Sequence, residues 1–164
     1  MNSLKTILVA ASLLVSVFAF AQAEHGNHTA GKGVAKNQEQ TAEFEFRAGQ
    51  VRNGEVKGNF SMTVGGQNLP SRVKIELKRI GNLEVGEDRA SFQGAGVLVV
   101  NRNGRLERVE GRIKVTVFDV TGPNENCEER THRERIQVEF NAANSKLSFA
   151  FEGCGTRGDI RVGP

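Results

Sequence analysis

The chain has 164 residues, with 22 basic and 19 acidic side chains. Because these charges nearly balance, nothing in the composition demands a nucleic acid or an anionic membrane as a partner. The chain contains no tryptophan and no tyrosine. This composition argues against a flat aromatic platform for stacking sugars and leaves polar contacts as the means of binding one.

Residues 1–23 have the pattern of an export signal. Lys5 supplies the positive start, an almost wholly apolar stretch covers residues 7–20, and residues 21–23 (AQA) form a small-x-small cleavage site. The apolar stretch is shorter than the roughly 20 residues that a membrane-spanning helix needs. We therefore predict a secreted or periplasmic protein, without a membrane span, in which removal of Lys5 leaves 21 basic against 19 acidic groups.

The next segment, residues 24–41, contains one valine and no large apolar side chain. Such a segment buries too little surface to offset the entropy lost on ordering, so we predict a flexible N-terminal arm. Residues 42–164 then form one domain, which is long enough to bury a hydrophobic core.

From residue 42 onward, apolar and polar side chains alternate with a period of two, which is typical of half-buried strands. Ile113, Val115 and Val117, for example, face one way while Lys114 and Thr116 face the other. The alternation predicts strands over residues 43–47, 54–64, 72–78, 91–100, 112–119, 136–140, 147–151 and, as a short last strand, 159–162. The sequence therefore predicts an all-β fold, an antiparallel β-sandwich or flattened barrel of about seven to eight strands.

Turn residues separate these strands. Glycine, asparagine and proline gather at residues 65–66, 81–82, 101–104, 121–124 and 141–144. Each cluster is typical of a tight connection between antiparallel strands, so we predict a break in the sheet at each.

The only two cysteines, Cys127 and Cys154, invite a disulfide in an exported chain. In the chain-entropy model, a loop of this length gives a bond that stabilises the fold by about 3–4 kcal/mol. Two free thiols are the alternative. A zinc site would need more ligands than two cysteines at this spacing supply.

The run from Cys127 to Arg135 is the densest in charge, and it is predicted to be a loop that leads into a strand. Its Arg130, His132, Arg133 and Arg135, together with Arg105 and Arg108 of an earlier hairpin, form the candidate binding patch. Arginine clusters can dock carboxylate-rich partners, so the predicted partner is an unidentified extracellular protein or polysaccharide. Interleaved glutamates cancel much of the field, and the alternative is an ordinary solvated surface.

Five motifs follow one another along the second half of the chain. They are FQGAG (residues 92–96), NRNG (101–104), KVTVFDVTGPN (114–124), RIQV (135–138) and GDIRV (158–162). In this order they resemble the secreted bacterial module called the post-COAP-1 domain. The resemblance covers residues 42–162 and implies a small all-β unit with no known catalytic residues. The cysteine-containing stretch after Pro123 is longer than that family's pattern.

The residues point to no established catalytic arrangement. His132 is the only histidine past residue 28, and no Gly-x-Ser-x-Gly turn exists to hold a nucleophile. We therefore predict no catalytic residues, no metal and no cofactor, and interpret the chain as a monomeric, non-catalytic binding or structural module. The alternative is a small secreted hydrolase whose site uses loop carboxylates such as residues 87–88 or 128–129.

Overall fold

The computed structural model describes residues 26–66, 69, 72–102, 104–119, 127 and 134–163. The predicted export signal lies outside the described residues. Within them the chain forms eight strands: β1 (His28–Lys36), β2 (Gln40–Gln50), β3 (Val56–Gly66), β4 (Val73–Val85), β5 (Arg89–Arg102), β6 (Arg105–Asp119), β7 (Glu134–Ala142) and β8 (Ser148–Gly163).

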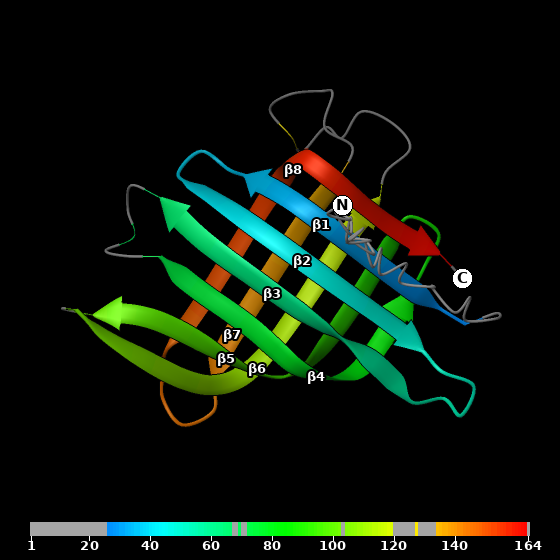
Figure 1. Ribbon diagram of the computed structural model, residues 1–164, viewed down its shortest axis with the longest axis horizontal. Coiled ribbons are helices and arrows are strands. Elements are labelled where there is room, and N and C mark those ends of the chain that lie inside the picture. The colour runs from blue at the N-terminus through cyan, green and yellow to red at the C-terminus, as the bar shows by residue number, and fades with distance from the viewer. Residues whose placement is uncertain are drawn as a thin grey trace, which may run out of the picture.

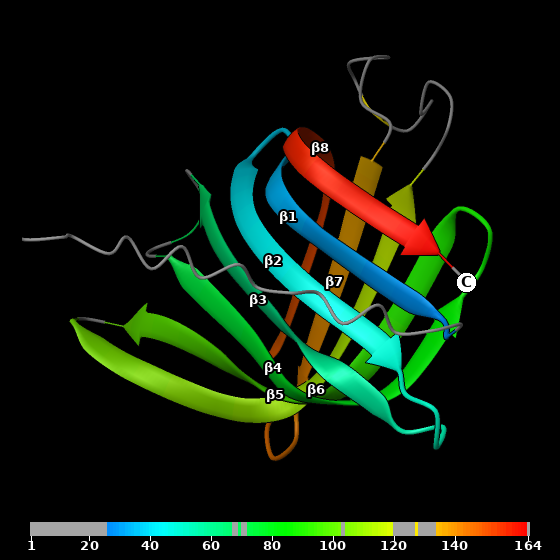
Figure 2. The ribbon, with the colours of Figure 1, turned by 45° about the vertical axis from the view of Figure 1, so that its right-hand side comes forward.

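Each strand pairs in antiparallel fashion with the next strand along the chain, and β8 pairs with β1 to close a barrel (Figure 1). This arrangement confirms the prediction of an all-β, antiparallel fold of seven to eight strands, in its barrel form. Closure leaves no edge strand along the seam, because β1 has a partner on each side (Figure 2). No helix among the described residues is long and apolar enough to cross a membrane.

The interior of the barrel is a packed hydrophobic core. The alternation seen in the sequence sends Phe44 and Phe46 of β2 inward, and both are almost completely buried. The ring of Phe46 lies 5.5 Å from that of Phe92, and the ring of Phe60 lies 6.1 Å from Phe92, so aromatic contacts join β2, β3 and β5 across the lumen. Side chains therefore fill the described barrel, as they do in other eight-stranded barrels.

The prediction of a flexible arm is wrong for residues 28–36, because these residues form β1. This strand pairs with β2 from His28↔Gly49 to Lys36↔Thr41 and with β8 on its other side. The prediction assumed that ordering requires large apolar side chains. In β1, backbone ladders on both edges hold the strand, and the Thr29 hydroxyl donates a hydrogen bond to the Arg161 carbonyl oxygen at 2.9 Å.

Small side chains in β1 are a requirement of the packing. A Cβ built on Gly31 would lie 2.6 Å from the ring of Phe46 and 3.0 Å from the carbonyl oxygen of Asp159. The ring of Phe46 therefore occupies the space that a side chain at position 31 would need. The same lack of large residues that suggested an arm lets this strand sit over a filled lumen.

Two predicted breaks between strands are also wrong, because the structure has one continuous strand at each place. The Gly81-Asn82 pair does not end a strand, because β4 continues through it with register shifts between Leu77 and Arg79 and between Ile80 and Asn82. Likewise, the strands predicted at 147–151 and 159–162 are one long strand, β8. A bulge absorbs an extra residue and bends the strand without interrupting it, so turn-forming residues inside these two strands do not mark connections.

The predicted disulfide forms between Cys127 and Cys154, whose Cα atoms are 5.8 Å apart. Cys154 lies on β8 opposite Arg135 of β7, and Cys127 belongs to the connection between β6 and β7. The bond therefore ties that connection to β8. Such a pair is consistent with an oxidising compartment.

We expect Gly31→Ala to lower the free energy of unfolding by about 1–3 kcal/mol, because the new methyl group overlaps the Phe46 ring. The urea midpoint of the purified chain measures the change. Gly49→Ala is the matched control, since a Cβ at Gly49 would make an ordinary 3.8 Å contact with His28. Equal midpoints for the two variants would contradict the close packing of β1.

We expect the double variant Cys127→Ser/Cys154→Ser to lose about 3 kcal/mol of unfolding free energy, since the bond restricts the unfolded chain. Urea denaturation with and without a reducing agent measures this loss. The reductant should shift the midpoint of the wild type toward that of the variant and leave the variant unchanged. A wild type insensitive to complete reduction would show that the bond contributes nothing.

Candidate functional site

The structure describes only some of the residues of the predicted arginine patch. Arg130, His132 and Arg133 lie outside the described residues. Arg135 stands at the start of β7, opposite Phe118 of β6, whereas Arg105 and Arg108 lie near the turn at the other end of β6. Thirteen positions separate Arg105 from Phe118, which is about 40 Å along a strand. The structure therefore does not bring Arg105 and Arg108 together with Arg135.

Arg135 packs on the outer wall of the barrel. Its guanidinium carbon lies 4.1 Å from the ring centroid of Phe118, and Arg89 approaches the same ring at 5.9 Å. Arg135 Nη1 also donates a hydrogen bond to Glu152 Oε1 at 3.2 Å, and its side chain is only 16% exposed. These contacts explain why Phe118 stands on the outward face of β6: two arginines on neighbouring strands cover it. Arg135 thus serves packing more than ligand capture.

A different surface, over β1, offers space for a ligand. Two adjoining hollows there have volumes of about 600 and 560 Å³. They meet at Lys32 and Glu45, which form an ion pair at 3.9 Å and line both hollows. We call this surface the β1 groove; the residues that line it are Ala30, Gly31, Lys32, Gly33, Val34, Glu43, Phe44, Glu45, Phe46, Arg47, Asn59, Ser61, Thr63, Arg157, Gly158 and Arg161.

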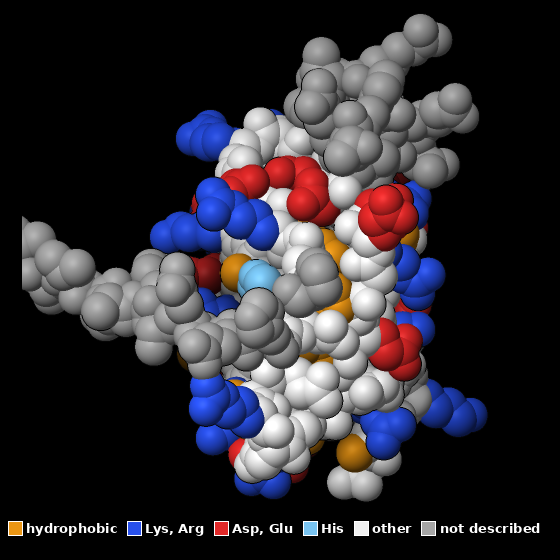
Figure 3. Space-filling view, turned by 90° about the vertical axis from the view of Figure 1, so that its right-hand side faces the viewer, with side chains coloured by type: hydrophobic (Ala, Val, Ile, Leu, Met, Phe, Trp, Pro, Cys, Tyr) orange, Lys and Arg blue, Asp and Glu red, His pale blue; other side chains and the backbone are white. Residues whose placement is uncertain are grey.

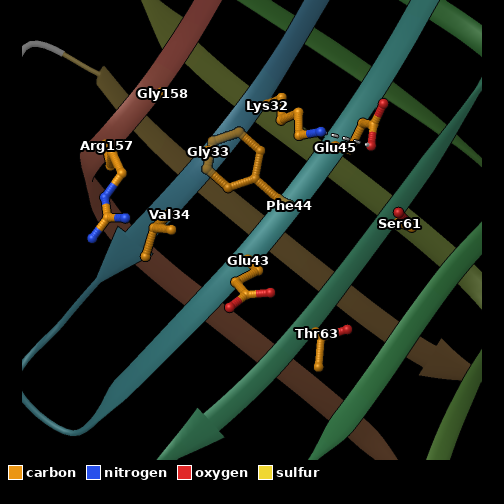
Figure 4. A pocket seen from close by; sticks show the side chains of 10 residues that line it. All are labelled: Lys32, Gly33, Val34, Glu43, Phe44, Glu45, Ser61, Thr63, Arg157 and Gly158. Atoms are coloured by element: carbon orange, nitrogen blue, oxygen red, sulfur yellow. Dashed lines mark ion pairs between the residues drawn. The ribbon is translucent and has the colours of Figure 1, made fainter.

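The groove arises from a difference in side-chain length. Short outward residues, such as Ala30 on β1 and Ser61 on β3, lie beside long charged ones on β1 and β2, such as Glu45, which is opposite Ser61. Figure 4 shows Lys32 and Glu45 reaching toward one another from β1 and β2, while Arg157 extends from β8 on the other side of β1. The groove is therefore a shallow channel on the outer face, with charged side chains along it and open to solvent.

Charge along the β1 groove is ordered in rows across the strands. In one row Ala30 lies between Arg47 of β2 and Arg161 of β8. In the next row Lys32 lies between Glu45 and Asp159. Arg161 Nε donates to Asp159 Oδ2 at 2.6 Å, so the acids partly neutralise neighbouring rows. One end of the groove thus carries a guanidinium group on each side of the Ala30 methyl group, and that of Arg161 is paired with Asp159.

The face at the right-hand side of Figure 1 carries basic and acidic side chains in alternation (Figure 3). Opposite charges close together weaken the long-range field, so steering of a charged partner over distance is small.

A second cluster gathers carboxylates at one end of β7. Glu134 lies opposite Asp119 of β6, and its Oε1 accepts a hydrogen bond from the backbone N–H of Ile160 at 3.0 Å. The β7–β8 ladder ends at Cys154, so this carboxylate takes the place of a strand partner for β8. Burial raises the pKa of Glu134 above its usual range, the Ile160 hydrogen bond opposes this, and Asp159 and Asp119 add to the rise.

Among residues 26–66, 69, 72–102, 104–119, 127 and 134–163, no group of three potential ligands is placed to hold a metal ion. The loop acids proposed from sequence do not help here, since residues 128–129 lie outside this part of the chain and residues 87–88 are exposed in the β4–β5 turn. Within it, Glu134 and Asp119 lie opposite one another with Asp159 nearby, and no pattern in the sequence marks these three carboxylates as a group.

Comparison with protein-family models, with curated proteins and with solved structures finds no match for this chain. The resemblance to the post-COAP-1 domain therefore stays a prediction that rests on the sequence motifs.

We expect Glu134→Gln to stabilise the fold at pH 7, because the raised pKa makes the ionised carboxylate unfavourable in the folded state. Glutamine keeps an oxygen that can accept the Ile160 hydrogen bond. The stability that Glu134 contributes is present below its unfolded pKa and is lost as pH rises through the folded pKa, so the advantage of the variant should shrink toward pH 4.

Urea midpoints at pH 4 and pH 7 measure this difference. Glu139→Gln, which neutralises an exposed carboxylate on the same strand, is the matched control. An advantage for Glu134→Gln that is equal at both pH values would show that titration of Glu134 is not its source.

Proposed function

We propose that this chain is an exported, non-catalytic binding module that holds an acidic polysaccharide in the β1 groove. The observation that carries the proposal is the row Arg47–Ala30–Arg161, which sets two guanidinium groups on either side of a small residue in an open channel. A planar guanidinium binds a carboxylate through two parallel hydrogen bonds, so such a row suits the uronate carboxylates of a polymer.

The remaining lining of the groove also favours a sugar polymer. Asn59, Ser61 and Thr63 offer amide and hydroxyl groups, which are suited to the hydroxyls of a sugar. The exposed aromatic anchors typical of protein–protein interfaces are missing from the composition, which has no tryptophan or tyrosine. A protein partner would therefore find few of the groups that usually dominate binding energy.

The filled lumen supports a role at the surface of the barrel. Barrels that carry small apolar ligands hold them inside, in a cavity between the strands. Here phenylalanine side chains from β2, β3, β5, β7 and β8 occupy that space within the described residues. The export signal predicted from residues 1–23 and the disulfide agree with work outside the cytoplasm.

We expect the mature chain to bind polygalacturonate in isothermal titration calorimetry, and Arg47→Gln/Arg161→Gln to weaken that binding by about tenfold, since each guanidinium–carboxylate contact near a surface contributes about 1 kcal/mol or less. Binding should weaken as salt is raised. Neutral dextran and polyglutamate serve as comparison polymers, the first without charge and the second with a peptide backbone.

Arg105→Gln/Arg108→Gln is the matched control, since it removes the same charge at the far end of β6. Equal weakening by both double variants would point to overall charge and overturn the groove as the site. Tighter binding of polyglutamate than of polygalacturonate would favour a protein partner.

A second candidate function, a small secreted hydrolase, is favoured by one observation: Glu134, the carboxyl with a raised pKa, has Asp119 and Asp159 near it on separate strands. Perturbed carboxyl groups are common in sites for general acid catalysis. Polymer cleavage by the wild type that disappears in Glu134→Gln, with binding unchanged, would favour this function over the module.

A further inference from the structure

The β5–β6 hairpin extends beyond its neighbours and leaves one side of β6 without a partner strand. The β6–β7 ladder covers only Gly111–Asp119. In the part of the chain that the structure describes, no strand pairs with Arg105–Glu110 on the side away from β5. Figures 1 and 2 show this hairpin projecting from the barrel. We call Arg105–Val109 the β6 tip edge, because the outward carbonyl oxygen of Glu110 already accepts a hydrogen bond from Ala143 N.

The β6 tip edge also carries the most exposed large apolar side chain among the described residues, Leu106, at 75% exposure. A tight turn, with Gly104 at φ +79°, brings Arg102 and Arg105 opposite one another and fixes the end of the hairpin. An unpaired strand edge with an exposed apolar residue is a template for pairing with another strand.

Backbone direction limits how a strand can pair with this edge. The Glu110 carbonyl oxygen accepts a hydrogen bond from Ala143 N, so it faces away from β5, whereas Asp119 N donates to Asp88 O and faces toward β5. Successive residues of a strand point their backbone groups to opposite sides, so the even-numbered residues of the tip edge, Leu106 among them, face outward.

This alternation allows only certain two-fold registers between two copies of the edge, because residues opposite one another must point the same way. A register centred on Glu107 would oppose that glutamate to its own copy, and one centred on Arg108 would oppose two arginines. A register centred on Val109 would need the outward backbone groups of Glu110, whose carbonyl oxygen Ala143 N already occupies. The register centred on Leu106 sets Leu106 against Leu106, and it sets Arg105 of each copy against Glu107 of the other. Facing opposite charges and facing apolar groups stabilise antiparallel strands.

In place of the monomer expected from the sequence, we infer that the β6 tip edge is the contact of a symmetric dimer, with a second copy of this chain as its occupant in the register centred on Leu106. The two hairpins then form a four-stranded antiparallel sheet, β5–β6–β6–β5, with the barrels at opposite ends. A hollow of about 590 Å³ beside this edge, lined by residues 107–110, 144, 145 and 147, receives the turn of the second copy. This inference does not rest on the proposed polysaccharide binding.

Sedimentation equilibrium of the mature chain tests the inference. The wild type should show a monomer–dimer equilibrium with a dissociation constant below about 1 mM, which corresponds to an association free energy of about 4 kcal/mol or more in favour of the dimer. Leu106→Asn and Arg105→Glu should each weaken dimerisation by about tenfold or more, since Arg105→Glu turns two attractive pairs into two repulsive ones. Arg108→Glu is the matched control: it makes the same charge change at a residue that faces Gly104, so its effect should be under about threefold.

Charge complementation gives the sharpest test. Arg105→Glu and Glu107→Arg should each dimerise poorly alone, whereas an equal mixture should form a heterodimer, because each reversed charge then meets its opposite. The double variant Arg105→Glu/Glu107→Arg should also recover dimerisation. A wild type that stays monomeric to about 1 mM, or a dimer insensitive to Leu106→Asn, or singles that fail to complement would overturn the inference.

Discussion

The pairing of β1 with both β2 and β8 is the constraint on which the rest of the structure depends. Without β1, β2 and β8 would each expose a row of unpaired backbone groups, and the phenylalanine core beneath would face solvent. The closing strand must lie directly over the ring of Phe46, so it has glycine at position 31. On the outer face the side chain of Ala30 is also small. The β1 groove results from this, because Ala30 lies at its bottom.

The fold class could be predicted from sequence because period-two alternation and inward burial are the same physical fact. Ile113, Val115 and Val117, selected as one face of a strand, are completely buried in the core. The disulfide could also be predicted, since a chain with two cysteines offers only one intramolecular disulfide. The register of β4 and the length of β8 could not be predicted, because bulges and turns use the same residue types. Only the pairing with neighbouring strands distinguishes a bulge from a turn.

The candidate site was harder to predict than the fold. The β1 groove runs over a segment that its composition assigns to a flexible arm, and most of its lining comes from strands far apart in sequence, with Arg47 on β2 and Arg161 on β8. A signal did exist, because Lys32, Val34 and Lys36 alternate with small residues and share one parity. The hydrophobicity of the segment alone does not predict a strand, because the backbone ladders on both edges stabilise β1. Arg135, in contrast, stands out in the sequence by its charge, whereas in the structure its guanidinium group packs on the ring of Phe118.

The long last strand has a consequence for how the chain reaches its native state. The hydrogen bond from Thr29 to Arg161 joins residues 132 positions apart, and every pair in the β1–β8 ladder spans a similar stretch of chain. Contacts this remote form only after the entropy of a very large loop has been overcome, which makes such topologies slow to fold. A ribosome must release the final sixteen-residue strand before the seam can be sealed. Until then β1 and β8 each leave one backbone edge without its partner, and the sheet stays open along that line.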